Sequence, residues 1–202
     1  MSGIRKVIFI MIKKLLEIKH WQLFSLLVLA PLLVQSFLFI TLFDILNLPL
    51  FFSLTTKLMF PFTILIYAWL WSMGIFLNKR LSVDTKMKIG VFKACMLISL
   101  SCQIFLSFFA GTKFITDPES KIAKMVILSG IICFVCILYC INFNTRALKT
   151  IEDREWVEQG GSVRFNDYRN EFILLLIFPV GLWLFQPRLN KLIKRSNSQR
   201  EQ

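Results

Sequence analysis

Four long apolar blocks decide what this chain can fold into. None of them contains an acidic residue, and they cover Trp21–Phe43, Leu58–Leu77, Ile89–Ala110 and Met125–Phe143. A helix needs roughly 20 apolar residues to cross the hydrocarbon core of a bilayer. In a helix of that length the backbone satisfies its own hydrogen bonds in lipid. The sequence therefore predicts an all-α, polytopic integral membrane protein, a helical bundle with four transmembrane helices in residues 21–143.

Two prolines bear on the course of these spans. Pro31 lies well inside the first block, where its ring and missing N–H predict a kink. Pro61 lies near the start of the second block, and we expect it in the first turn of that helix, where a missing N–H does no harm. Before the fourth block, Asp117 followed by Pro118 predicts a helix cap and a first helical residue.

The fourth helix is predicted to continue past the bilayer. Residues 144–158 contain neither glycine nor proline and would extend about 22 Å at 1.5 Å per residue. Oppositely charged residues stand at i, i+4 spacing in two pairs, Lys149 with Asp153 and Arg154 with Glu158. Gly160 and Gly161 then end the helix. We expect residues 144–171 to form a cytoplasmic extension and loop, with a protein partner bound through 144–158.

The apolar stretch in residues 172–193 either turns back as a re-entrant hairpin or forms a short fifth span. Only 16 uncharged residues separate Glu171 from Arg188, and Pro179 and Gly181 interrupt them. If the stretch turns back, 20 Lys and Arg residues lie on one side of the membrane and 4 on the other; if it spans, the division is 15 to 9. The positive-inside rule favours the hairpin, with both termini in the cytoplasm.

The two ends of the chain are polar or amphipathic. Residues 1–20 predict a basic amphipathic helix in the membrane surface, with a cytoplasmic extension of the first span as the alternative. Residues 194–202 form a polar tail. The net charge of +12 flanks the apolar blocks. It therefore indicates topology signals and anionic lipid headgroups of a cytoplasmic (inner) membrane, and no nucleic-acid partner.

The five cysteines lie within predicted spans and raise the question of redox chemistry. They form two stripes of small residues, Ser129, Cys133, Cys136 and Cys140 on the fourth span and Cys95, Ser99 and Cys102 on the third. Such stripes let membrane helices approach closely, whereas a redox thiol needs a positively charged, partly exposed setting. His20 is the only histidine and has no second ligand at metal-binding spacing. We therefore expect packing, and neither a metal nor another cofactor.

Polar residues gather where the hairpin would leave and re-enter the inner headgroup layer. The candidate contact residues for a lipid headgroup or a partner are Asn166, Asp167, Arg169, Glu171, Arg188 and Asn190. The two arginines could hold a lipid phosphate, with the acidic residues orienting them. The alternative is that Asn166 or Asp167 only caps the helix that follows.

No residue pattern in the chain indicates a known catalytic mechanism. Nucleophile, zinc-protease and phosphate-loop motifs do not occur, and the spans have no charged residue near their centres. The sequence favours a non-enzymatic accessory or scaffolding protein. Two alternatives stay open: a lipid-binding or lipid-modifying protein that uses the polar cluster, and a small transporter or pore-forming subunit. The oligomeric state is also open.

Overall fold

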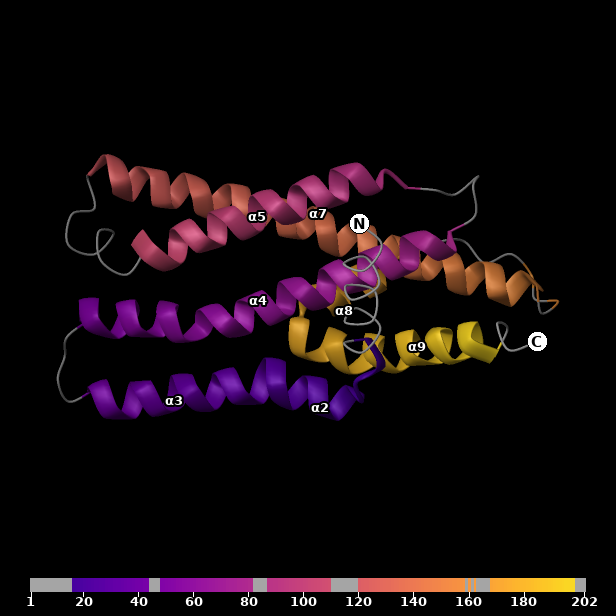
Figure 1. Cartoon of the computed structure of the whole chain (residues 1–202), viewed down its shortest axis with the longest axis horizontal. Coiled ribbons are helices and arrows are strands. Elements are labelled where there is room, and N and C mark those ends of the chain that lie inside the picture. The colour runs from indigo at the N-terminus through magenta and orange to yellow at the C-terminus, as the bar shows by residue number, and fades with distance from the viewer. Residues whose placement is uncertain are drawn as a thin grey trace, which may run out of the picture. The chain divides into compact units, whose positions relative to one another are not determined.

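Helices make up almost all of the chain that the structure describes. The computed structural model describes residues 16–43, 48–81, 87–109, 120–158, 160, 162 and 168–198, among which no strand occurs (Figure 1). The helices are α2 (His20–Phe24), the π-helical turn η1 (Ser25–Leu29), α3 (Ala30–Phe43), α4 (Leu48–Arg80), α5 (Ile89–Phe109), α7 (Lys121–Glu158), α8 (Arg169–Leu176) and α9 (Phe178–Ser198).

Four helical segments in these residues are long and apolar enough to cross a membrane. They are His20–Thr41, Ser53–Arg80, Ile89–Phe109 and Lys121–Glu158. Each contains all or nearly all of one predicted apolar block. The prediction of an all-α, polytopic membrane protein with four spans is therefore confirmed.

The first span is one helical run with an irregular turn before its proline. The five residues of η1 adopt π geometry and end two residues before Pro31. A proline ring presses on the carbonyl group four residues earlier, which here belongs to Leu27 inside η1. A π turn widens the helix and is a common way to relieve such a contact. The distortion expected at Pro31 therefore takes the form of a π-helical turn.

The expected position of Pro61 in a first turn was wrong. Helix α4 already begins at Leu48, so Pro61 lies in its interior, 13 residues after the first helical residue. The apolar block marks where lipid-compatible residues begin, but helical hydrogen bonding extends back through the more polar residues before it. One of them, Thr56, donates its hydroxyl hydrogen bond to the Ser53 carbonyl oxygen at 3.1 Å, within the helix itself.

The fourth span and its extension form one uninterrupted helix, as predicted. Helix α7 continues to Glu158, and Gly160, at a φ of 85°, donates its backbone N–H to the Val157 carbonyl at 3.0 Å. This left-handed conformation after the last turn suits glycine. At the other end, the Ser120 hydroxyl accepts a hydrogen bond from the Ala123 N–H at 3.1 Å. Asp117 and Pro118 lie outside the described residues.

The C-terminal stretch turns back on itself. Helix α8 ends at Leu176, Ile177 is not helical, and α9 begins at Phe178. In a continuous helix residues 171 and 188 would be about 25 Å apart. Instead, Arg188 Nη2 lies 3.4 Å from Glu171 Oε1. The pair α8 and α9 is therefore a helical hairpin and not a single fifth span.

A glycine allows the close approach between the two hairpin helices. A Cβ atom on Gly181 would lie 2.4 Å from the Leu174 carbonyl oxygen and 2.6 Å from the Leu175 Cα. Pro179 is the second residue of α9, where the absence of a backbone N–H costs nothing. The two residues that suggested a bend in the sequence thus lie directly after it.

The chain divides into two compact units. We call residues Met1–Ser25, Ala68–Ile89 and Ile141–Gln202 the hairpin unit, and Leu26–Tyr67 and Gly90–Cys140 the span unit. The predicted surface helix of residues 1–20 falls mostly outside the described residues, which begin at Leu16. The last four residues of the polar tail also lie outside them.

In the span unit the two stripes of small residues face each other, as predicted for packing. The Ser99 hydroxyl donates to the Cys133 carbonyl oxygen at 3.3 Å and lies 2.5 Å from the Tyr67 hydroxyl. Further along, the Ser129 hydroxyl donates to the Cys102 carbonyl oxygen at 3.5 Å. Short side chains bring α5 and α7 close enough for these contacts. All five cysteines are free thiols.

Candidate functional site

Beyond its apolar block, α7 is packed along one side. Asn144, Ala147, Leu148 and Ile151 are all buried within the hairpin unit. They recur at the three- and four-residue spacing of one helix face. The extension predicted as a docking helix is thus already occupied on this face by its own chain, and only its other side is accessible.

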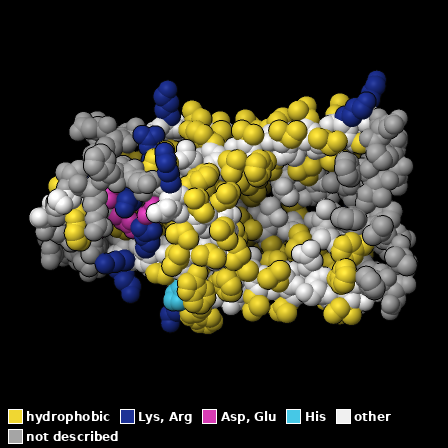
Figure 2. Space-filling view, turned by 180° about the vertical axis from the view of Figure 1, so that it is seen from behind, with side chains coloured by type: hydrophobic (Ala, Val, Ile, Leu, Met, Phe, Trp, Pro, Cys, Tyr) yellow, Lys and Arg dark blue, Asp and Glu magenta, His cyan; other side chains and the backbone are white. Residues whose placement is uncertain are grey.

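An ion-pair network fastens this helix to the hairpin. The Arg188 guanidinium binds the Glu152 carboxylate in a bidentate pair, with Nε donating to Oε1 at 2.8 Å and Nη2 donating to Oε2. Glu171 of α8 accepts a weaker bond from Arg188 at 3.4 Å and lies 3.9 Å from Lys149 Nζ. Lys149 also pairs with Asp153 at 3.4 Å. Figure 2 shows the acidic side chains gathered in one patch beside lysines and arginines.

The charges of this network balance almost completely from within. Two cations, Arg188 and Lys149, meet three carboxylates, Glu152, Asp153 and Glu171. Burial lowers the pKa of the Arg188 guanidinium, but the hydrogen bond and charge of Glu152, and then those of Glu171, outweigh burial and leave the pKa raised. The network as a whole has one excess negative charge.

A second tie joins the hairpin to α4 and to the N-terminal segment. The Gln186 side chain is fully buried and uses its whole amide. Its Oε1 accepts from Trp69 Nε1 at 2.9 Å, and its Nε2 donates to the carbonyl oxygens of Leu16 at 2.7 Å and Ile18 at 3.0 Å. Three chain segments distant in sequence thus meet at one side chain.

Aromatic contacts place the hairpin beside residues of the first two candidate spans. The Trp183 ring meets the rings of His20 and Phe24 edge to face, at centroid distances of 5.0 and 5.3 Å. Phe178, at the start of α9, meets Trp69 in the same way at 6.2 Å. His20 and Phe24 open the first span and Trp69 lies within the second candidate span. Phe178, beside the turn of the hairpin, therefore contacts the interior of the second candidate span, whereas Trp183 contacts the start of the first.

Positions along α7 show how far the contacts of the hairpin unit lie from the fourth apolar block. Asn144, the first residue after the fourth apolar block, donates its amide to the Leu70 carbonyl oxygen at 3.2 Å. Glu152 lies eight residues further along, or about 12 Å at 1.5 Å per residue. The ion pair of Arg188 with Glu152 is therefore well beyond the end of the fourth apolar block.

The structure brings together some of the predicted site residues and not others. Glu171 and Arg188 are in contact, as described above. Asn190 instead donates to the Ile18 carbonyl oxygen at 3.4 Å. Arg169 is exposed at the first residue of α8. Asn166 and Asp167 lie outside the described residues. The role of this set in binding a lipid headgroup or a partner stays a prediction.

Sequence reasoning missed Glu152, Gln186 and Trp69. A signal existed for Glu152, because it lies on the same side of α7 as Lys149 and Asp153, three residues after one and next to the other. A signal also existed for Gln186, which is the one amide in the apolar run before Arg188. Nothing in the sequence indicated that Trp69 would be its partner.

Metal ligands and relatives were both sought as guides to function. No group of three or more His, Cys, Asp or Glu in the described part of the chain is arranged to hold a metal. The chain matches no known family model, and comparisons with curated proteins and with solved structures find no match. Its function must therefore be inferred from its own residues.

Proposed function

We propose that this protein is a non-enzymatic accessory or scaffolding protein of the cytoplasmic membrane, with both termini in the cytoplasm. The observation that carries the proposal is an exposed apolar pair, Trp156 and Val157, in the last turn of α7. Their side chains are 47% and 44% exposed. Beside them, Arg154 pairs with Glu158 at 2.8 Å on the surface.

The position of this pair along α7 supports a protein partner over lipid. Exposed apolar residues within a span face hydrocarbon and need no further partner. Trp156 follows Asn144 by 12 residues, about 18 Å of helix. At that distance from the end of the apolar block, Trp156 and Val157 face water. An exposed aromatic and aliphatic pair with a polar rim is typical of a protein interface.

The rigidity of the supporting helix is the second argument. The buried side of α7 and the contact of Glu152 with Arg188 hold the extension in one place. Binding to a rigid surface costs less conformational entropy than binding to a surface that must first become ordered. The hairpin thus serves as a brace for the docking surface.

The experiment compares partner recovery from native membranes. Tagged wild type and the double variant Trp156→Gln, Val157→Ser are purified in mild detergent and analysed by quantitative mass spectrometry. We expect a stoichiometric protein with the wild type and at least a tenfold loss with the double variant. Arg146→Gln, exposed on the same helix, is the matched control and should retain the partner. Recovery of lipid without any protein, or equal recovery by the double variant, would contradict the proposal.

One observation favours lipid binding as a second candidate. The hairpin has an exposed apolar side made of Ile173, Leu176, Ile177, Val180 and Trp183. On the same two helices Arg169, Lys191 and Lys194 are exposed. Apolar insertion beside basic residues suits an anionic membrane surface. In this candidate a headgroup would contact the exposed Arg169 at the start of α8. Arg169→Ala should then reduce co-purifying anionic lipid, whereas unchanged lipid content would remove this candidate.

A further inference from the structure

The exposed side of the hairpin changes character along its length. At the open end the exposed side chains of α8 and α9 are polar or basic, and they are Arg169, Asn170, Lys191 and Lys194. Towards the turn the large exposed side chains are apolar, and they are Ile173, Leu176, Ile177, Val180, Trp183 and Leu184. Both helices make this change in the same direction. The turn end therefore suits hydrocarbon, and the open end suits headgroups or water.

The contacts of α9 within the hairpin unit follow the same direction. Phe178, beside the turn, meets Trp69 inside the second apolar block at a centroid distance of 6.2 Å. Trp183 meets two rings at the start of the first block. Arg188 binds Glu152, beyond the end of the fourth block. From residue 178 to residue 188, about 15 Å of helix, α9 thus passes from the apolar part of the unit to its charged part.

The exposed apolar part of the hairpin is too short for both leaflets of a bilayer. Along α9 it runs from Ile177 to Leu184, which is about 10 Å of helix. The hydrocarbon of one leaflet is about 15 Å thick, half of a core of roughly 30 Å. The apolar part therefore fits within one leaflet. Because α8 returns to the side from which α9 leaves, neither helix enters the other leaflet.

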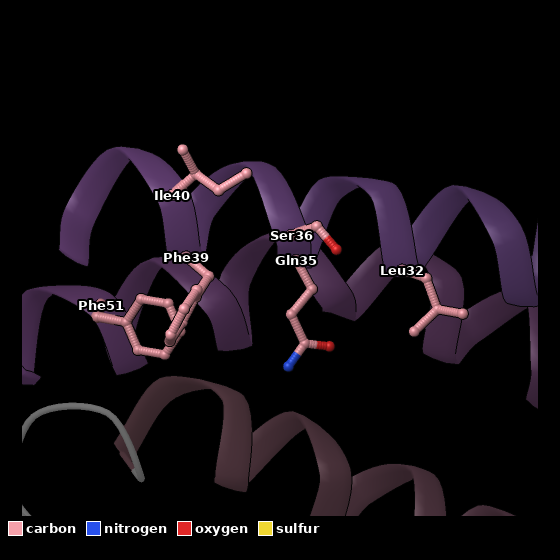
Figure 3. Close-up of a pocket in the computed structure, with 6 residues that line it drawn as sticks. All are labelled: Leu32, Gln35, Ser36, Phe39, Ile40 and Phe51. Atoms are coloured by element: carbon pink, nitrogen blue, oxygen red, sulfur yellow. The ribbon is translucent and has the colours of Figure 1, made fainter.

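The first span differs from the hairpin in this respect. Its large exposed apolar side chains extend from Leu26 to Ile40, about 21 Å of helix, which is more than one leaflet. Figure 3 shows the later part of this stretch, beside a cavity of about 480 Å³. The cavity is lined by Leu32, Gln35, Ser36, Phe39, Ile40 and Phe51. The first span thus adds cross-section to both leaflets, whereas the hairpin adds it to one.

We propose that the hairpin is a one-leaflet wedge, through which the protein prefers curved membrane that is convex on the hairpin side. When a bilayer bends, the leaflet on its convex side expands, and its lipids are less closely packed. An apolar insert in that leaflet fills the added area, and insertion of this kind depends on curvature. The partner is thus the expanded lipid leaflet. This inference extends the lipid-binding candidate from a lipid surface to a curved one, and it needs no protein partner.

The hairpin is fastened to the rest of its unit, so its preference applies to the whole chain. Arg188 binds Glu152 of α7, and the buried Gln186 accepts a hydrogen bond from Trp69 of α4 at 2.9 Å. A loosely attached hairpin would leave a crowded leaflet without moving the spans. A hairpin held at these two points stays in the leaflet, and the spans move with it along the membrane.

The test measures how the purified full chain distributes between a giant vesicle and a narrow membrane tube pulled from it. In the tube the outer leaflet is expanded. A tag at Gln202, labelled from outside with a membrane-impermeant dye, marks the chains whose hairpin lies in the outer leaflet. We expect these chains to be enriched in the tube by at least about twofold. The control is the same chain tagged at residue 115, which marks the opposite orientation and should be depleted from the tube. Equal densities in tube and vesicle, or the same sorting of both labels, would overturn the proposal.

A second measurement assigns the sorting to the hairpin. The triple variant Ile173→Ala, Leu176→Ala, Val180→Ala shortens only exposed side chains, so the packing within the hairpin unit should be kept. We expect it to lose about half of the enrichment or more, at an unchanged thermal midpoint. The matched control is Leu33→Ala, Phe37→Ala, Ile40→Ala, exposed in the first span at least about 18 Å from its start and so beyond one leaflet. It should keep the enrichment. Wild-type sorting by the hairpin variant, or equal losses in both variants, would overturn the proposal.

Discussion

The substitution Gln186→Leu tests how the hairpin is joined to the rest of its unit. The Gln186 amide makes four hydrogen bonds, to the buried indole of Trp69, to the carbonyl oxygens of Leu16 and Ile18 and, at 3.5 Å, to the Asn190 side-chain oxygen. Leucine fills the space but makes none of them. An unpaired buried N–H costs about 1 to 3 kcal/mol, and each lost carbonyl bond roughly 0.5 to 1.5 kcal/mol. Because leucine also gains apolar burial, we expect a net loss of about 2 to 4 kcal/mol.

Limited proteolysis measures the local part of this loss. Gln186 holds residues 16–18 through two of its bonds, and Lys19 next to them is exposed. Losing those two bonds should destabilise the segment by about 1 to 3 kcal/mol, so trypsin should cleave after Lys19 roughly 5- to 150-fold faster. The readout is the fragment that begins at His20, by mass spectrometry in detergent. Gln22→Leu, the same change at an exposed position, is the control.

A double-mutant cycle with Trp69→Phe completes the test. Removing the indole N–H and the amide together leaves fewer unpaired groups than the two single changes added. We therefore expect a coupling of roughly 1 to 2 kcal/mol between them. Wild-type cleavage after Lys19 and an unchanged thermal midpoint in Gln186→Leu would refute the reasoning, as would full additivity in the cycle.

Three further predictions concern the hairpin and its side of the membrane. Arg188→Ala should destabilise the protein by about 1 to 3 kcal/mol in thermal unfolding, with Arg188→Lys intermediate, because a partly buried bidentate pair with Glu152 is lost. Gly181→Ala should cost about 1 to 3 kcal/mol, because its Cβ would meet the Leu174 backbone at 2.4 Å. Reporter fusions at Gln202 should give a cytoplasmic signal, and fusions at residue 115 an external one.

Each of these has its own control and contrary result. Lys191 is exposed on α9, so Lys191→Ala should change the free energy of unfolding by less than about 0.5 kcal/mol. If Arg188→Ala changes it by no more than Lys191→Ala does, the ion pair does not stabilise the protein. Gly130→Ala meets no atom within 4 Å and should be neutral or stabilising; the same outcome at Gly181 would contradict the close helix approach. An external signal from the Gln202 fusion would contradict the proposed topology.

Much of the fold could be predicted because membrane helices obey a local rule. A run of apolar residues long enough to cross the hydrocarbon core forms a helix there, so the four blocks predicted four spans. The absence of glycine and proline from residues 144–158 likewise predicted that α7 continues to Glu158. The start of α4 was missed, because polar residues before a block can extend a helix without any change in hydropathy.

The candidate site was predicted only in part, for a different reason. Charge and position suggested Glu171 and Arg188 as site residues. The Arg188 guanidinium, however, donates to the carboxylate of Glu152, which lies 36 residues earlier in the chain. No spacing rule connects residues on two helices whose relative placement depends on a turn. The same holds for Gln186 and Trp69, which are 117 residues apart.

The sequence by itself determined that this is a membrane protein with four spans. It also determined the stripes of small residues and the interruption at Pro179 and Gly181. These follow from composition and from helix geometry, which act over a few residues. Tertiary structure alone decided which polar groups meet. Arg188 binds Glu152, and Gln186 joins three chain segments that are distant in sequence. The reason is that hydrogen bonds and ion pairs require contact in space, which only the packed chain defines.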